Sequence, residues 1–82
     1  MIAIKVKVFA SLRDLCGFSE KELHFEDSIS VEEFLNYILE QFPVLISRSD
    51  SLLVAVNEEY CSRDYSLKDG DIVAIFPPVS GG

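Results

Sequence analysis

Apolar and charged residues alternate at the start of the chain. Ile2, Ile4, Val6 and Val8 occupy every second position, with lysines between the later ones. A period of two is typical of a strand that buries one face. A shorter alternation over residues 22–26 predicts a second strand, antiparallel to the first. Between the two strands we expect an irregular or one-turn helical segment.

The pattern changes to a helical period after residue 30. Ser30 and Glu33 have the spacing of a capping box, in which each side chain bonds the backbone amide of the other residue. Apolar residues then recur on one helix face, at Val31, Phe34, Leu35, Ile38, Leu39 and Phe42. Pro43 stops this pattern. We therefore expect an amphipathic helix whose apolar and aromatic stripe packs into the core.

The second half of the chain predicts three more strands after a polar loop over residues 47–51. Residues 52–57 are almost continuously apolar, as in a strand inside a sheet. A shorter segment follows around Tyr60, and residues 72–76 form a last strand that is apolar on both faces. The order strand, strand, helix, strand, short strand, strand predicts an α+β fold. One long helix would cross a mixed sheet with its first and last strands adjacent and parallel, which is the β-grasp, or ubiquitin-like, arrangement.

The length of the chain and its net charge limit the functions that it can have. The 82 residues suffice for one domain, which we place at residues 1–76, followed by an extended tail at 77–82. The net charge of −7 disfavours nucleic acid and anionic membranes as partners. No apolar run approaches the about 20 residues of a membrane span, and the N-terminus lacks the layout of a signal peptide. We expect a cytoplasmic protein.

The usual constellations of catalytic or metal-binding residues are missing from the sequence. Cys16 and Cys61 are far apart and are expected to be free thiols, and no metal site is expected. The single histidine, His24, is expected to point outward from its strand. There is no glycine-rich phosphate loop, and the carboxylates at Asp69 and Asp71 have the setting of ordinary turn residues.

The most distinctive segment is Phe76-Pro77-Pro78-Val79-Ser80-Gly81-Gly82. The two prolines lack amide donors, so the strand must stop there, and they favour an extended exit. Two terminal glycines without side chains allow the segment to enter a narrow channel and present an α-carboxylate to a distant active site. The competing interpretation is an ordinary frayed end.

This heptapeptide resembles the C-terminal motif of the small, sulfur-carrier subunits of molybdopterin synthase, a ubiquitin-like family. The segment Val8-Phe9-Ala10-Ser11-Leu12-Arg13-Asp14-Leu15-Cys16-Gly17 is similar to the N-terminal segment of that family. Residues 53–57 and 67–74 resemble its internal strands and turn. The resemblance covers nearly the whole chain and implies a β-grasp fold, in agreement with the pattern of strands and helix.

The resemblance implies a sulfur-donating subunit that binds no cofactor itself. The Gly82 carboxylate, preceded by Gly81, would be adenylated by a ubiquitin-activating-type adenylyltransferase that holds ATP and magnesium. A persulfide donor would then convert Gly82 to a thiocarboxylate. The tail would insert into the large catalytic subunit of molybdopterin synthase, within a heterotetramer, and donate sulfur to cyclic pyranopterin monophosphate to form the molybdopterin dithiolene. The catalytic groups would come from the partners.

The resemblance also implies a partner-binding surface that includes Phe9, Arg13, Phe76, Pro77, Pro78, Val79 and Ser80. The alternatives are ordinary core positions for Phe9 and Phe76 and a solvated side chain for Arg13. Three rival functions stay open: a thiamine-type sulfur carrier, a ubiquitin-like protein modifier and a plain interaction domain. The sequence does not distinguish a molybdenum from a tungsten cofactor, nor does it identify the sulfur donor.

Overall fold

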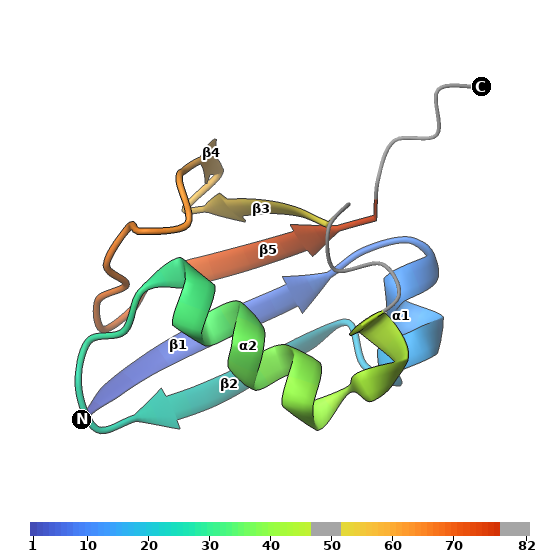
Figure 1. The fold of residues 1–82 in the computed structure, drawn as a ribbon, viewed down its shortest axis with the longest axis horizontal. Coiled ribbons are helices and arrows are strands. Elements are labelled where there is room, and N and C mark those ends of the chain that lie inside the picture. Colours follow the sequence, from blue (N-terminus) through green and yellow to red (C-terminus); the bar gives the residue numbers. More distant parts are fainter. Residues whose placement is uncertain (47–51, 78–82) are drawn as a thin grey trace.

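The computed structural model describes residues 1–46 and 52–77, so the predicted loop at 47–51 and Pro78 to Gly82 lie outside the described residues. The elements are β1 (Ile2–Val8), α1 (Ser11–Cys16), β2 (Glu20–Phe25), α2 (Val31–Gln41), β3 (Leu53–Val56), β4 (Glu59–Tyr60) and β5 (Ile72–Phe76). The strands form one sheet in the order β2-β1-β5-β3-β4, and α2 crosses one face of it (Figure 1). The predicted mixed sheet with one long helix is confirmed.

Strand β1 is central to the fold and follows its alternating sequence. Ile4, Val6 and Val8 are buried in the core beneath α2, whereas the lysines between them lie on the other face. β1 pairs antiparallel with β2 and parallel with β5, as the element order predicted. On the far face, the Nζ atoms of Lys5 and Lys7 lie 3.6 and 3.9 Å from the carboxylate of Glu20. Both pairs are exposed to solvent, so they add little stability.

Helix α2 begins with the predicted capping box. The Glu33 amide donates a 3.1 Å hydrogen bond to Ser30 Oγ, and the Ser30 amide donates a 3.0 Å bond to Glu33 Oε1. Hydrogen bonds to the Glu33 carboxyl from the backbone amide of Ser30, and secondly from its side chain, lower the pKa of that carboxyl because they stabilise its charged form. The helix ends at Gln41, and residues 43–46 form a short 3₁₀ turn after Phe42. The buried members of its apolar stripe are Val31, Phe34, Leu35 and Ile38.

Two short connections complete the fold. Helix α1 ends at Gly17, whose φ of 82° places it in the left-handed region, and the Gly17 amide donates to the Arg13 carbonyl. Ala10, just before α1, has φ 54° and ψ −132°. Asn57 and Glu58 join β3 to β4 with φ values of 51° and 71°. Such positive values favour glycine, so the backbone at Ala10 and Glu58 is strained.

The single histidine points outward and the two cysteines are free thiols packed against the core, as their sequence setting predicted. His24 is exposed on β2, and its Nε2 lies 3.1 Å from the Glu22 carboxylate. Cys16 and Cys61 are free thiols that are each partly buried, and burial raises the pKa of both. Across residues 1–46 and 52–77, no helix combines the length and apolar character needed to cross a membrane.

Candidate functional site

The face of the sheet that α2 leaves uncovered carries an apolar groove. Val54, Val56, Val73 and Ile75 are buried in the core on the helix side. Because side chains alternate along a strand, their neighbours on β3 and β5 point to the opposite face. There they line a groove of about 420 Å³. Its lining residues are Lys7, Phe9, Ala55, Asn57, Glu58, Tyr60, Ile72, Ala74 and Phe76.

Phe9 and Phe76, two of the predicted partner-binding residues, are stacked at one end of this groove. Their ring centroids are 4.7 Å apart and their planes differ by 9°. Phe9 is 39% exposed and Phe76 is half-buried, and neither belongs to the core cluster. The alternative that both are ordinary core residues is therefore wrong. Pro77 follows Phe76 directly, so the groove begins where the predicted tail leaves the sheet.

The opposite end of the groove is held by a hydrogen-bonded turn. Asn57 Nδ2 donates to Asp71 Oδ1 at 3.0 Å, and the Ile72 amide donates to Asn57 Oδ1 at 3.0 Å. The Lys68 amide donates to the other oxygen of Asp71 at 2.8 Å. Asp71 lies in the predicted turn, but it is only 9% exposed, so it is a buried, bonded carboxylate, which the sequence did not indicate. A buried carboxylate needs such donors to offset its lost hydration.

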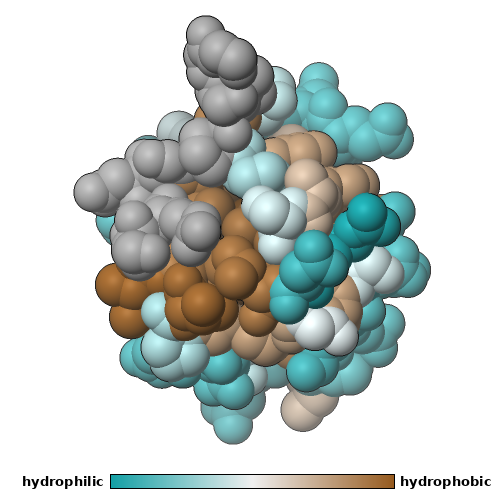
Figure 2. Space-filling model, turned by 90° about the vertical axis from the view of Figure 1, so that its right-hand side faces the viewer, coloured by the Kyte–Doolittle hydropathy of each residue, from teal (hydrophilic) through white to brown (hydrophobic). Residues whose placement is uncertain are grey.

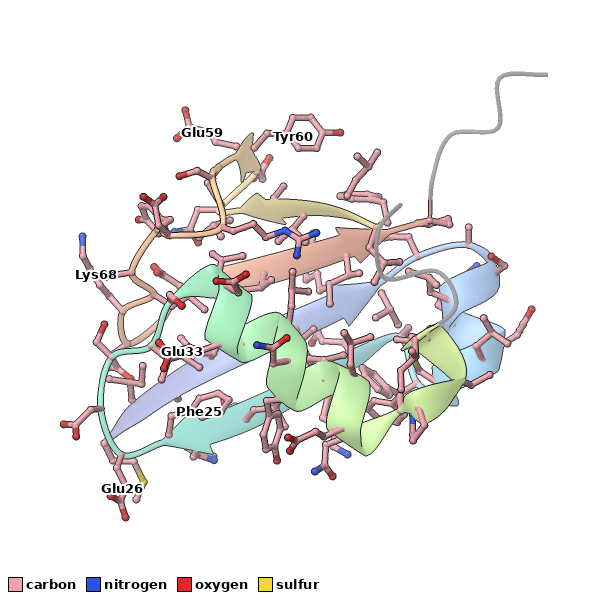
Figure 3. All side chains as sticks on the ribbon, viewed as in Figure 1. Phe25, Glu26, Glu33, Glu59, Tyr60 and Lys68 are labelled. Atoms are coloured by element: carbon pink, nitrogen blue, oxygen red, sulfur yellow. The ribbon has the colours of Figure 1, made fainter. Side chains whose placement is uncertain are left out.

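This turn places Tyr60 at the rim of the groove, a position that the sequence prediction missed. Tyr60 pairs with Ala55 across the antiparallel β3–β4 ladder and is 73% exposed. In Figure 3 it projects from the outer edge of the sheet, next to Glu59. The only available signal was an aromatic residue on a short strand after a buried strand. An exposed tyrosine beside an apolar groove is typical of a protein-binding surface.

The other predicted site residues are distributed as follows. Arg13 lies on α1, is exposed and does not line the groove. Pro77 is half-buried beside Phe76. The remaining predicted residues, Pro78, Val79, Ser80, Gly81 and Gly82, lie outside the described residues. The predicted sulfur-carrying role of Gly81 and Gly82 and the predicted partner-binding roles of the other residues stay predictions.

Apolar side chains also gather at the end of the molecule next to the groove. Figure 2 shows this end, where an apolar area adjoins the residues drawn in grey. The elements here include α1 and the 3₁₀ turn after α2 (Figure 1). Val44 and Ile46 in that turn are 46% and 57% exposed. Contiguous exposed apolar patches on proteins often mark contact with another protein.

The lining of the groove is suited to the recognition of apolar side chains. Its charged lining residues are Lys7 and Glu58, one of each sign. No group of three or more histidine, cysteine, aspartate or glutamate side chains is placed to hold a metal ion within residues 1–46 and 52–77. An apolar, aromatic-rimmed groove with little charge accepts apolar side chains from a partner protein.

Comparison with known proteins finds matches both in sequence and in structure. The model of the ThiS family matches residues 6–82. The chain is 40% identical to the molybdopterin synthase sulfur carrier subunit of Chlamydomonas reinhardtii, over 96% of this chain and 98% of that protein. The small archaeal modifier protein 1 of H. volcanii has a similar structure, with a TM-score of 0.84 and 25% identity, over 96% of this chain and 100% of that one.

A further solved structure shows the same fold with a partner. The complex of subunits 1 and 2 of molybdopterin-converting factor from Helicobacter pylori contains a chain that matches with a TM-score of 0.71. The identity is 23%, over 99% of this chain and all of that one. The likeness to these structures agrees with the ubiquitin-like β-grasp topology seen here.

Proposed function

The chain belongs to the ThiS family and to its molybdopterin synthase sulfur carrier subunits, and we propose that it carries sulfur as a thiocarboxylate on Gly82. One observation supports this most strongly, namely the match to such a carrier subunit over almost the full length of both chains. The groove beside Pro77 supports a partner-dependent role, because it offers a docking surface where the tail leaves the sheet. We place this activity in the cytoplasm.

The activation step supplies the electrophile that a carboxylate lacks. A Gly82 oxygen attacks the α-phosphorus of ATP on an adenylating enzyme, which also holds the magnesium ion, and pyrophosphate leaves. The terminal sulfur of a persulfide then attacks the acyl carbon, and AMP leaves. A thiol of the donor system reduces the resulting acyl disulfide, forming a new disulfide and releasing the Gly82 thiocarboxylate. In this scheme the chain contributes the acyl group, and its partners contribute the acids and bases.

The transfer step consumes that sulfur. We propose that the tail enters the large subunit of a molybdopterin synthase, where the thiocarboxylate sulfur attacks a carbon of cyclic pyranopterin monophosphate and displaces the oxygen substituent of that carbon. Hydrolysis of the acyl link restores the carboxylate of Gly82. Because a dithiolene holds two sulfur atoms, each product molecule consumes two charged carriers. The two-subunit complex of the Helicobacter pylori relative supports a large-subunit partner, and we propose that the complex is a heterotetramer.

Mass spectrometry tests the carrier function directly. The untagged protein is incubated with ATP, an adenylating enzyme of the family and a persulfide donor, and its C-terminal fragments are sequenced. We expect one oxygen replaced by sulfur, localised to Gly82. Localisation is essential, because oxidation of Met1 or of a cysteine changes the mass almost equally. A Gly82 carboxylate that stays unmodified under these conditions contradicts the proposal.

The structural likeness to an archaeal modifier protein favours a second candidate function, attachment of Gly82 to lysines of other proteins. The two functions share the adenylate and differ in its fate. A ladder of covalent conjugates on a denaturing gel, lost when Gly82 is deleted, indicates the modifier. A Gly82 thiocarboxylate with no conjugates indicates the carrier.

A further inference from the structure

The groove on the uncovered face of the sheet has a floor of two alanines. Ala74 of β5 and Ala55 of β3 lie opposite each other in the antiparallel ladder. Lys7 of β1 is the partner of Ala74 on one side, and Tyr60 of β4 is the partner of Ala55 on the other. The four residues therefore form one row across the sheet, and all of them line the groove. Each of the two central positions in this row carries only a methyl group.

Larger side chains surround these two methyl groups. Phe9 and Phe76 stack at one end of the groove, and Ile72 lies at the other end. Because side chains on one face recur at every second residue, Ile72 and Phe76 flank Ala74 along β5. Ala55 is only 6% exposed, yet it does not belong to the core cluster beneath α2. Its neighbours on the uncovered face therefore bury it, and the hollow above the two alanines is a socket, which we call the alanine socket.

One rim of the alanine socket carries a positive charge that the protein offsets only in part. Lys7 Nζ lies 3.9 Å from the carboxylate of Glu20, and the same carboxylate lies 3.6 Å from the Nζ of Lys5. One carboxylate shared by two ammonium groups offsets one of their two charges. The opposite rim carries the acidic residue Glu58 of the β3–β4 turn. A partner group that fills the socket is therefore favoured when an acidic neighbour of that group faces Lys7.

We propose that the alanine socket receives one bulky apolar side chain of the large subunit, aliphatic or aromatic, with a carboxylate beside it that pairs with Lys7. This inference rests on the proposed carrier function, because it names the group through which that partner docks. A side chain buried in such a pocket contributes more binding energy than the contacts around it. A second copy of the chain is a poorer occupant, since two molecules of net charge −7 repel each other.

Filling the socket from within the protein tests the proposal. Ala74→Leu places a larger apolar side chain on the floor of the groove. Ala3→Leu makes the same change on β1, on the same face of the sheet but outside the groove. We expect Ala74→Leu to weaken binding to the large subunit by about 30-fold, the loss of one anchor, and Ala3→Leu to stay within about 2-fold of wild type. Titration calorimetry measures the affinities, and urea denaturation establishes that both variants are folded.

The charged rim is tested by a separate variant. Lys7→Met keeps the apolar stem of the side chain and removes the ammonium group. It should weaken binding to the large subunit by about 2- to 5-fold at low salt, the range of an exposed ion pair. The difference from wild type should disappear at high salt, because salt screens exposed charges. Equal affinities of wild type and Lys7→Met at low salt overturn the proposed acidic neighbour.

A measurement on the free protein keeps the test independent of the large subunit. Phenylacetate joins an aromatic ring to a carboxylate, and NMR spectra follow the methyl groups of Ala55 and Ala74 while it is added. We expect saturable shifts of both methyl signals in the wild-type protein, with a Kd of millimolar order, and no shift of the Ala55 signal in Ala74→Leu. Absence of these shifts in the wild-type protein overturns the inference.

The outcomes separate this inference from the proposed function. If the large subunit does not bind the wild-type protein, the proposed function fails, and the methyl shifts alone decide whether the socket accepts an apolar group. Equal affinities of wild type and Ala74→Leu for the large subunit overturn the inference and leave the carrier function standing. If the wild-type protein dimerises and Ala74→Leu does not, a second copy occupies the socket, and the assignment to the large subunit is wrong.

Discussion

The side-chain amide of Asn57 donates a 3.0 Å hydrogen bond to the carboxylate of Asp71, joining the β3–β4 turn to the start of β5. The two residues are 14 positions apart in the sequence, so the contact belongs to the tertiary fold. The backbone amide of Asn57 also donates a hydrogen bond to the Ile72 carbonyl at 2.8 Å. Together these bonds hold the turn that carries Tyr60 to the groove.

Removing the Asp71 carboxylate is expected to destabilise the protein. Asp71→Ala leaves the Asn57 side chain and the Lys68 amide without their acceptor, and an unsatisfied buried donor costs about 1–3 kcal/mol. Urea denaturation measures the free energy of unfolding of this variant. Asp69→Ala is the matched control, because Asp69 accepts one exposed bond, from the Ala3 amide at 2.8 Å. A loss for Asp69→Ala as large as that for Asp71→Ala contradicts the assigned role of the buried carboxylate.

A glycine at position 58 is expected to stabilise the β3–β4 turn. Glu58 has a φ of 71°, and Asn57 before it has a φ of 51°, which is the pattern of a type I′ turn. Glu58→Gly creates the favoured Asn-Gly pair and relieves strain, with an expected gain of about 0.5–1 kcal/mol. Thermal unfolding measures the change. Glu59→Gly, one residue later within β4, should instead lower the midpoint, and the expectation fails if both variants respond alike.

The capping box contributes to the stability of the folded state, and this contribution is lost in acid. Hydrogen bonds from Ser30 lower the pKa of Glu33 below 4.5, so its charged form is favoured in the folded state. That contribution is fully present above the unfolded pKa and is lost as the pH falls through the lower, folded pKa. A carbon NMR titration of the Glu33 carboxyl measures the shift directly.

Substitution of the N-cap residue Ser30 tests whether its hydrogen bonds lower the pKa of Glu33. Ser30→Ala removes the side-chain hydrogen bond to the Glu33 carboxyl but keeps the bond from the Ser30 backbone amide, so the Glu33 pKa should rise only part of the way toward its ordinary value. Stability should fall by about 1 kcal/mol, the usual cost of losing a serine N-cap. Glu33→Gln should remove the pH dependence while keeping most of the helix. An unshifted Glu33 pKa in the wild-type protein would contradict the capping geometry.

Most of the fold was predictable from local signals, and the missed parts depend on tertiary contacts. The alternation around Ile4 and the Ser30–Glu33 spacing each specify an element within a few residues, and both elements form as expected. Asp71 lies in its predicted turn, but its burial was missed, because a carboxylate in a polar turn has the same local sequence whether or not a distant asparagine bonds it. Tyr60 was missed because its place in the groove depends on pairing with β3.

The contact between Phe9 and Phe76 shows the same limit at the site itself. Both residues were selected by resemblance, and no periodicity in either segment indicates that their rings stack. The stack follows from the parallel pairing of β1 and β5, which joins the two ends of the chain. The topology was predictable from the order of elements, but the stacking of the two rings depends on tertiary packing that no local pattern specifies.

The groove is expected to contribute more to partner binding than to folding. Phe76 is half-buried on the uncovered face of the sheet, so truncating it exposes little of the core. Aromatic residues at the centre of an interface often contribute 2 kcal/mol or more to binding, so Phe76→Ala should weaken binding to the large subunit by about 30-fold. Titration calorimetry measures the affinity, and urea denaturation of the same samples measures the free energy of unfolding.

Tyr65→Ala provides the matched control for this prediction. Tyr65 is 37% exposed, similar to Phe9, but it does not line the groove. Its truncation should leave the affinity for the large subunit within about 2-fold of wild type, as expected outside an interface core. If Phe76→Ala loses as much unfolding free energy as binding free energy, Phe76 serves the fold, and the groove is not the docking surface. If both variants weaken binding equally, the partner contacts a different face of the sheet.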